Sequence, residues 1–232
     1  MALKTLQVAP DLAQRCYEAL IESISSGDMV VGRKYTQEEL AASLGVSRQP
    51  VLQALQTLKR QGLITESDNR RGVQVAPLDA TFVQNLYQVR AALDGAASRA
   101  AAMLPRPELR EPGMRLIRAG RAASARRDLK ALVRADMDFH AFLYDASHNP
   151  LLVQTATVHW HHTRRLMTAY LQHGVSLRSV WAEHQAMLAA VVKGDSRAAE
   201  RLARDHCESA ERLVLRLLFR QDERVVAAAE TA

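Results

Sequence analysis

The sequence has few cysteines, glycines and prolines and no long apolar run. Its 232 residues include 2 Cys, 10 Gly and 7 Pro. The two cysteines, Cys16 and Cys207, are far apart and do not indicate a disulfide framework. No apolar stretch approaches the ~20 residues that a membrane-spanning helix needs, and the first ten residues lack the features of an export signal. We therefore expect a cytoplasmic protein with no membrane partner.

The composition allows a well-packed globular protein but says little about its partners. Hydrophobic residues make up 48% of the chain, which is enough for one large domain or two smaller ones. The net charge of +6 suggests nucleic-acid binding. However, most of the positive excess lies after residue 75. Whether the chain binds nucleic acid must therefore be judged from local sequence patterns.

Start and stop signals in the first third of the chain predict a winged helix-turn-helix. Thr36, with Glu39 three residues later, has the pattern of a capping box, and Gly45 ends the helix that this box opens. Ser47 then caps a second helix, and two short strands joined by a polar turn follow it. The predicted elements are helices at 12–26, 36–44 and 47–61 and strands at 63–65 and 72–75.

The second helix of this motif has an outer face suited to the major groove of DNA. On a helical wheel, Gln49 and Gln53 lie opposite an apolar side that must face the core. Gln can hydrogen-bond adenine in bidentate fashion, while Arg and Lys hold phosphates or read guanine. Arg70 and Arg71, at the tip of the hairpin, could reach phosphates or the minor groove. A solvated helix face with an ordinary hairpin also fits, although it leaves Leu52 uncovered near the polar side.

After Pro77 the periodicity is that of helices alone, so we expect a mainly α fold. The expected parts are a winged helix-turn-helix DNA-binding domain at 1–76, an all-helical bundle at 77–222 and a frayed tail at 223–232. The predicted helices of the bundle are 79–104, 108–126, 128–147, 151–172, 176–193 and 195–221.

Four polar residues interrupt the apolar faces of three of these helices. Asp136 and His140 lie one turn apart in the middle of one apolar stripe. His184 and His206 are each at the centre of a stripe on the last two helices. Both lie about 15 Å from the turn at 194–195, at 1.5 Å per residue, and are therefore level with each other.

This arrangement favours a shared ligand. A single histidine in an apolar stripe is usually a hydrogen-bonded core residue, but four polar groups on three inward faces need another explanation. A buried carboxylate needs a countercharge, which a divalent cation supplies and neutral imidazoles do not. One Asp with three His suits Zn²⁺, Ni²⁺ or Mn²⁺. The sequence thus predicts a metal site formed by Asp136, His140, His184 and His206.

The stretch EELAASLGVSRQPVLQALQTLKRQGLI, followed by NRRGVQV, resembles the DNA-binding half of the GntR family of bacterial regulators. The resemblance implies a homodimer that binds a short palindromic DNA operator. Ser47 and Arg48 would contact the DNA backbone and a base. Leu52 stands where the family usually has arginine, and Gln53 where it often has glutamate, so the operator sequence of relatives does not transfer. The expected DNA-binding residues are Thr36, Ser47, Arg48, Gln49, Gln53, Arg70, Arg71 and Gly72.

The D-x-x-x-H of DMDFH and the histidines of AEHQAML and ARDHCES resemble the FCD ligand-binding domain of the FadR-like branch of that family. The resemblance implies a small organic-acid effector whose carboxylate reaches the metal or an arginine. Arg90 matches the arginine common near the start of this domain, and Asp94 replaces the usual glutamate. We expect His159 to line the effector pocket with Arg90. The histidines expected to face solvent are His161, His162 and His173.

Two hypotheses compete with a ligand-responsive transcription regulator, which we expect to be a repressor. The first is a metal-dependent enzyme, which would need a general base near the ligands. Glu183 and Asp205 each precede a ligand by one residue and are expected to point elsewhere, so we expect no catalysis. The second is a regulator in which the metal is purely structural.

Overall fold

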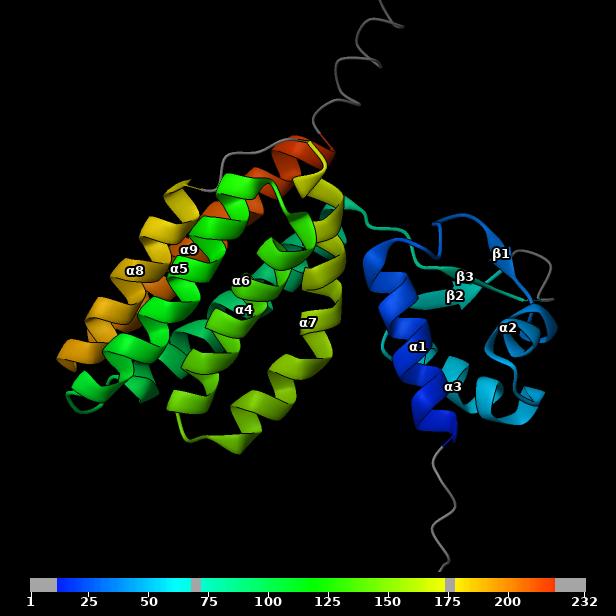
Figure 1. The fold of residues 1–232 in the computed structure, drawn as a ribbon, viewed down its shortest axis with the longest axis horizontal. Helices are drawn as coiled ribbons and strands as arrows, with labels where there is room; N and C mark the ends of the chain where they lie inside the picture. Colours follow the sequence, from blue (N-terminus) through cyan, green and yellow to red (C-terminus); the bar gives the residue numbers. More distant parts are fainter. Residues whose placement is uncertain (1–11, 68–71, 174–177, 220–232) are drawn as a thin grey trace, which may run out of the picture. The chain divides into compact units, whose positions relative to one another are not determined.

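The structure is a computed structural model that describes residues 12–67, 72–173 and 178–219 (Figure 1). The chain separates into two compact units between Pro77 and Leu78. The described part of the first unit has three helices and a small sheet, and that of the second is helical throughout. The mainly α fold predicted from the sequence is therefore confirmed. None of the described helices combines the length and the apolar character that a membrane span requires.

The first unit is a winged helix-turn-helix. Its sheet is antiparallel, with β3 between β1 and β2. The strand β1 was not predicted, because two residues are too few to show an alternating pattern. In chain order the elements are α1 (Leu12–Ser26), β1 (Lys34–Tyr35), α2 (Gln37–Leu44), α3 (Arg48–Arg60), β2 (Ile64–Glu66) and β3 (Val73–Val75).

Local signals place the helices of this unit as predicted. The hydroxyl of Thr36 accepts a hydrogen bond from the backbone N–H of Glu39 at 3.1 Å, and Gly45 ends α2 with a φ of +65°. The apolar side of α3 is buried against α1, which leaves its polar side exposed. At the wing, a Cβ on Gly72 would lie 2.6 Å from the backbone oxygen of Tyr35, so only glycine fits there. Arg70 and Arg71 lie outside the described residues.

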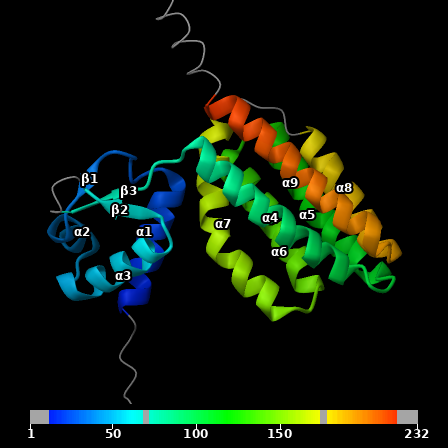
Figure 2. The same ribbon diagram turned by 180° about the vertical axis from the view of Figure 1, so that it is seen from behind.

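The second unit is a helical bundle in which segments far apart in sequence pack together. The helix α9 lies along α4, and α8 packs against both α5 and α9 (Figures 1 and 2). Side chains of Asp or Asn, which are preferred at helix N-caps, cap α4, α6, α7 and α9. The helices are α4 (Ala80–Ala101), α5 (Arg110–Arg126), α6 (Leu129–Ala146), α7 (Pro150–Leu171), α8 (Arg178–Lys193) and α9 (Ser196–Leu218), with a 3-10 turn η1 (Pro107–Leu109) before α5.

Two glycines allow α5 and α8 to approach closely. A Cβ on Gly120 would lie 2.0 Å from the indole of Trp181, and one on Gly113 would lie 2.6 Å from the side chain of Leu188. These large side chains are buried in the gaps that the glycines leave. The contact sets the position of α8 and directs His184, one turn after Trp181, into the bundle.

Candidate metal centre

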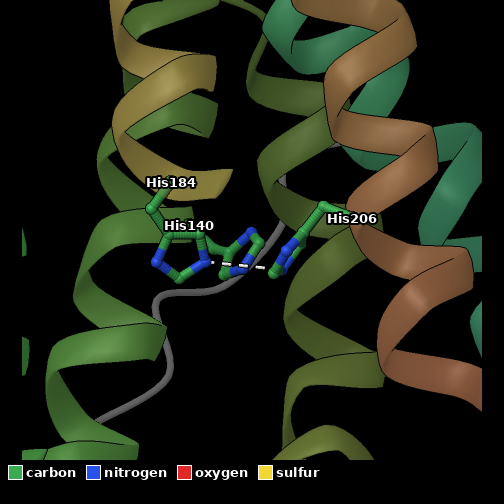
Figure 3. A group of neighbouring side chains, drawn as sticks. All are labelled: His140, His184 and His206. Atoms are coloured by element: carbon green, nitrogen blue, oxygen red, sulfur yellow. Dashed lines mark hydrogen bonds between the residues drawn. The ribbon is translucent and has the colours of Figure 1, made fainter. Parts of the chain in front are cut away.

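Three imidazoles meet inside the bundle, one each from α6, α8 and α9 (Figure 3). They belong to His140, His184 and His206, all buried, and each offers a ring nitrogen within 4.8 Å of the others. The Nε2 atoms of His184 and His206 are 3.3 Å apart. The level placement expected from the turn between α8 and α9 is therefore present in the structure.

A carboxylate completes this cluster. Asp136, one turn before His140, is buried, and its Oδ1 lies 3.6 Å from Nε2 of His184. Its Oδ2 lies 3.9 Å from Nε2 of His140. The structure thus brings together all four residues that the sequence singled out, with Nε2 as the inward atom of each ring.

The donor atoms fit a metal ion. A tetrahedral ion with bonds of about 2.1 Å separates its donor atoms by about 3.4 Å, close to the 3.3 and 3.6 Å seen here. Nε2 of His140 is buried and has no hydrogen-bond partner among the residues that the structure describes, which is costly unless another group uses its lone pair. Burial, followed by the nearby His206 and His140, holds the pKa of His184 well below its usual range. A neutral imidazole is the form that binds a metal.

Carboxylates hold the outer nitrogens of two of these rings. Nδ1 of His140 lies 3.3 Å from Oδ2 of Asp94, and Nδ1 of His206 lies 2.8 Å from Oε2 of Glu183. A ring that donates from Nδ1 keeps its Nε2 lone pair for the centre, and such contacts fix the ring orientation at metal sites. The expectation that Glu183 points away from the ligands is wrong. Its long side chain reaches back to the next helix, which a wheel drawn at Cα positions does not show.

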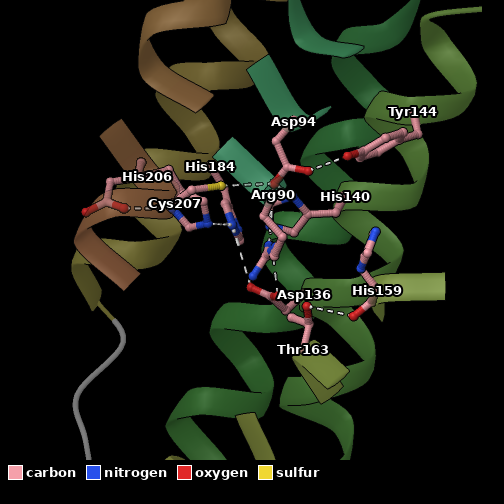
Figure 4. Close-up of polar contacts among 11 residues, drawn as sticks. Arg90, Asp94, Asp136, His140, Tyr144, His159, Thr163, His184, His206 and Cys207 are labelled. Atoms are coloured by element: carbon pink, nitrogen blue, oxygen red, sulfur yellow. Dashed lines mark hydrogen bonds and ion pairs between the residues drawn. The ribbon is translucent and has the colours of Figure 1, made fainter. Parts of the chain in front are cut away.

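Asp94 connects the cluster to a buried polar network (Figure 4). It accepts hydrogen bonds from the Tyr144 hydroxyl at 2.6 Å and the Cys207 thiol at 3.2 Å, and it pairs with Arg90 at 3.5 Å. Burial alone would raise the pKa of Asp94, but Arg90, and after it His140, lower that pKa well below its usual range. Burial also raises the pKa of the Cys207 thiol. Asp94 is therefore an anion that receives hydrogen bonds from the groups around it.

A pocket of about 180 Å³ adjoins the cluster. Asp136, His206 and Arg90 form part of its wall, and Glu183 also lines it. Apolar groups, among them Met167 and Leu213, line other parts. The pocket therefore offers both charged and apolar surface to a small molecule next to the candidate metal ligands.

Two family models match this chain, and together they span most of it. The FCD domain matches residues 85–209, and the model named bacterial regulatory proteins, gntR family, matches residues 12–75. The chain belongs to the GntR family. Its two units are thus the DNA-binding and FCD parts of a GntR-type transcription regulator.

Individual relatives of the chain are distant in sequence. The uncharacterized HTH-type transcriptional regulator YdhC of Bacillus subtilis is 29% identical over 134 residues, which are 57% of this chain and 59% of that relative. The Uxu operon transcriptional regulator of Escherichia coli is 26% identical over 88% of each chain. The crystal structure of a putative GntR regulator from Rhodococcus sp. RHA1 has the same fold, with 22% identity, a TM-score of 0.74 and coverage of 89% of this chain and 98% of that one.

In the DNA-binding part of this GntR protein, several of the predicted contact residues are exposed at α3. Gln49 and Gln53 are exposed on α3, and Ser47 is its N-cap residue but makes no capping hydrogen bond with its side chain. The exposed guanidinium of Arg48 pairs with Glu38 of α2 at 2.7 Å. Thr36 uses its hydroxyl as a helix cap.

Two histidines of the FCD part differ from expectation. His159 is half-buried on α7 and is not among the residues that line the pocket. Burial lowers its pKa. His162, expected to face solvent, is 4% exposed and packs against Phe82 with ring centroids 4.9 Å apart. His162 was expected to be exposed because it is polar, but it lies on the buried face of α7.

Proposed function

We propose that this protein is a dimeric transcription repressor that holds a divalent metal ion in its helical unit and responds to a small organic acid. One observation carries the proposal. Three buried histidines and Asp136 turn their donor atoms to one point, and that point adjoins a pocket with an arginine in its wall.

The metal ligands in this proposal are Asp136, His140, His184 and His206. Three nitrogens and one oxygen form a ligand set for Zn²⁺, Ni²⁺ or Mn²⁺. The bound ion would supply a positive charge that attracts an acid's carboxylate. Because Asp94 and Glu183 already orient two of the rings, little rearrangement is needed for binding.

The size and charge of the pocket support a small acid as effector. Its volume of about 180 Å³ is below the roughly 300–1,000 Å³ of drug-sized sites. Arg90 is buried and stays charged because Asp94 outweighs the effect of burial on its pKa. An acid that prefers one arrangement of the dimer would change operator affinity.

An uncharged surface on two neighbouring helices supports the homodimer. In α4 up to Ser98 the only charged side chains are the buried Arg90 and Asp94, and α7 has none up to Thr163. The same helices expose Val89, Leu151 and Val158. In a chain with 24% charged residues, such a surface suits a second copy, because a two-fold interface uses the same patch on both subunits and its buried centre is depleted in charged residues.

The relatives' names and the exposed face of α3 support repression through DNA. A probable D-xylose utilization operon transcriptional repressor of Paenarthrobacter nicotinovorans is 32% identical over 39% of this chain and 40% of that relative. In our proposal Ser47, Arg48, Gln49 and Gln53 contact the operator, with Gly72 at the wing.

The test measures metal content, acid binding and DNA binding on the full-length protein. Elemental analysis should find about one equivalent of a divalent metal, lost in Asp136→Asn but kept in Asp138→Asn, an exposed aspartate on the same helix. Organic acids should then weaken binding to DNA flanking the protein's own coding region. Turnover of an acid would support an enzyme instead, and metal without acid binding would support a structural metal.

The dimer has a separate test. Val158→Glu places a charge on the proposed interface and should shift the sedimentation coefficient towards that of a monomer. Ala122→Glu, on the exposed side of α5, is the matched control and should remain dimeric. A Val158→Glu protein that sediments as wild type would overturn this surface as the interface.

A further inference from the structure

The pocket beside the metal ligands has charged groups at two separate places. Arg90, Asp136 and His206 lie at the cluster, whereas Arg216 lines the pocket further along α9. Ten residues separate His206 from Arg216, which is about 15 Å of helix at 1.5 Å per residue. The side chains between them on the α9 wall are those of Ser209, Ala210 and Leu213.

No other polar interaction occupies the side chain of Arg216 in the described part of the chain. Arg216 makes no ion pair or hydrogen bond with the residues described, whereas Arg204 and Arg212 on the same helix pair with neighbouring glutamates. Arg90 differs, because its charge is already balanced by Asp94. Arg216 therefore offers the pocket a cation that has no counterion among the described residues.

The charged groups at the cluster already have partners within the protein. Arg90 pairs with Asp94 at 3.5 Å, and Glu183 lies 2.8 Å from Nδ1 of His206. A divalent ion on the histidines and Asp136 would attract one acidic group of a ligand. Arg216 is a second, separate position for an acidic group in the same pocket.

From this geometry we propose that the effector is a dianion with an acidic group at each end. One carboxylate lies at the metal and Arg90, the chain of the molecule passes the apolar wall, and the second acidic group pairs with Arg216. This inference rests on the proposed function, because it assumes an acid bound beside the metal. Arg216 is then a specificity-determining residue that distinguishes a diacid from a monoacid of the same length.

The experiment compares adipate with hexanoate, which share a carbon skeleton and differ in the second carboxylate. Titration calorimetry on the zinc-loaded full-length protein should give adipate about fivefold higher affinity, the value of a partly exposed ion pair. Arg216→Gln should remove this preference by weakening adipate and leaving hexanoate unchanged. Arg201→Gln, an exposed arginine of α9 outside the pocket, should keep the preference.

The outcomes separate this inference from the proposed function. Equal affinity of the two acids for wild type, or equal loss of both in Arg216→Gln, would overturn the dianion but leave an acid sensor. If neither acid binds and a wider set of mono- and dicarboxylates also fails, the sensor itself is overturned, and the dianion with it. A preference for adipate that weakens in high salt supports the pairing with Arg216.

Discussion

Nδ1 of His140 lies 3.3 Å from Oδ2 of Asp94, on the side of the ring that faces away from the other histidines. The two residues belong to different helices, α6 and α4. Asp94 also compensates the buried charge of Arg90. One carboxylate therefore both orients a candidate metal ligand and keeps an arginine charged in the core.

Replacing this carboxylate should weaken metal binding and the fold together. We expect Asp94→Asn to lower zinc affinity about 10- to 100-fold, as for other outer contacts of metal ligands, measured by competition with a chromophoric chelator. Leaving Arg90 unpaired should also cost about 3 kcal/mol of unfolding free energy, measured by urea denaturation of the metal-free protein. Asp145→Asn, exposed on α6, should change neither quantity. Unchanged zinc affinity in Asp94→Asn would contradict the orienting role.

Removing the metal should lower the stability of the helical unit. A ligand present at 100 times its dissociation constant adds about 2.7 kcal/mol to the folded state, so EDTA should lower the Tm of wild type by several degrees. In His206→Ala, EDTA should have little further effect, because a ligand has been lost. His173→Ala, an exposed histidine, should respond to EDTA as wild type does. Calorimetric scans measure all three, and an equal response of His206→Ala and wild type would argue against the site.

The ion pair between Arg48 and Glu38 should compete with DNA. Arg48→Ala should weaken operator binding and reduce the slope of log affinity against log salt by about one, because one phosphate contact is lost. Glu38→Gln should strengthen binding, because it frees Arg48 and removes a negative charge beside α3. Fluorescence anisotropy at several salt concentrations measures both variants. Both side chains are exposed, so Tm should not change; wild-type affinity in Arg48→Ala would reject the proposed docking.

Gly120→Ala should destabilise the protein, although alanine is normally the better helix former by about 1 kcal/mol. The added methyl group would overlap the buried indole of Trp181, and such overpacking costs about 1–3 kcal/mol. Because Trp181 contacts His184, with ring centroids 4.9 Å apart, metal affinity should fall as well. Ala119→Gly, at an exposed position of the same helix, should lose only the stability that glycine normally costs within a helix. Urea denaturation of both variants measures whether the unfolding free energy falls or rises. A Gly120→Ala protein more stable than wild type would refute the tight contact.

Helix starts and stops were predictable because their signals are local. Thr36 and Gly45 bound a helix by hydrogen bonding and backbone conformation within a few residues, and the stripes of α6, α8 and α9 follow from a fixed helical period. The helical period also predicts which residues of a helix are exposed, such as Gln49. The two-residue β1 escaped prediction, since its pairing with β3 depends on a segment about forty residues away.

The sequence by itself determined that the chain is a winged helix-turn-helix followed by a helical bundle, and that Asp136 and three histidines lie on inward faces. Only the tertiary structure decided what surrounds them: Asp94 behind His140, Glu183 behind His206, and Arg216 at a distance along the same pocket. The physical reason is that periodicity gives the direction of a side chain from its own helix axis. Which atoms meet there depends on how neighbouring helices are rotated and spaced. The contact between Gly120 and Trp181, for example, sets the spacing of α5 and α8.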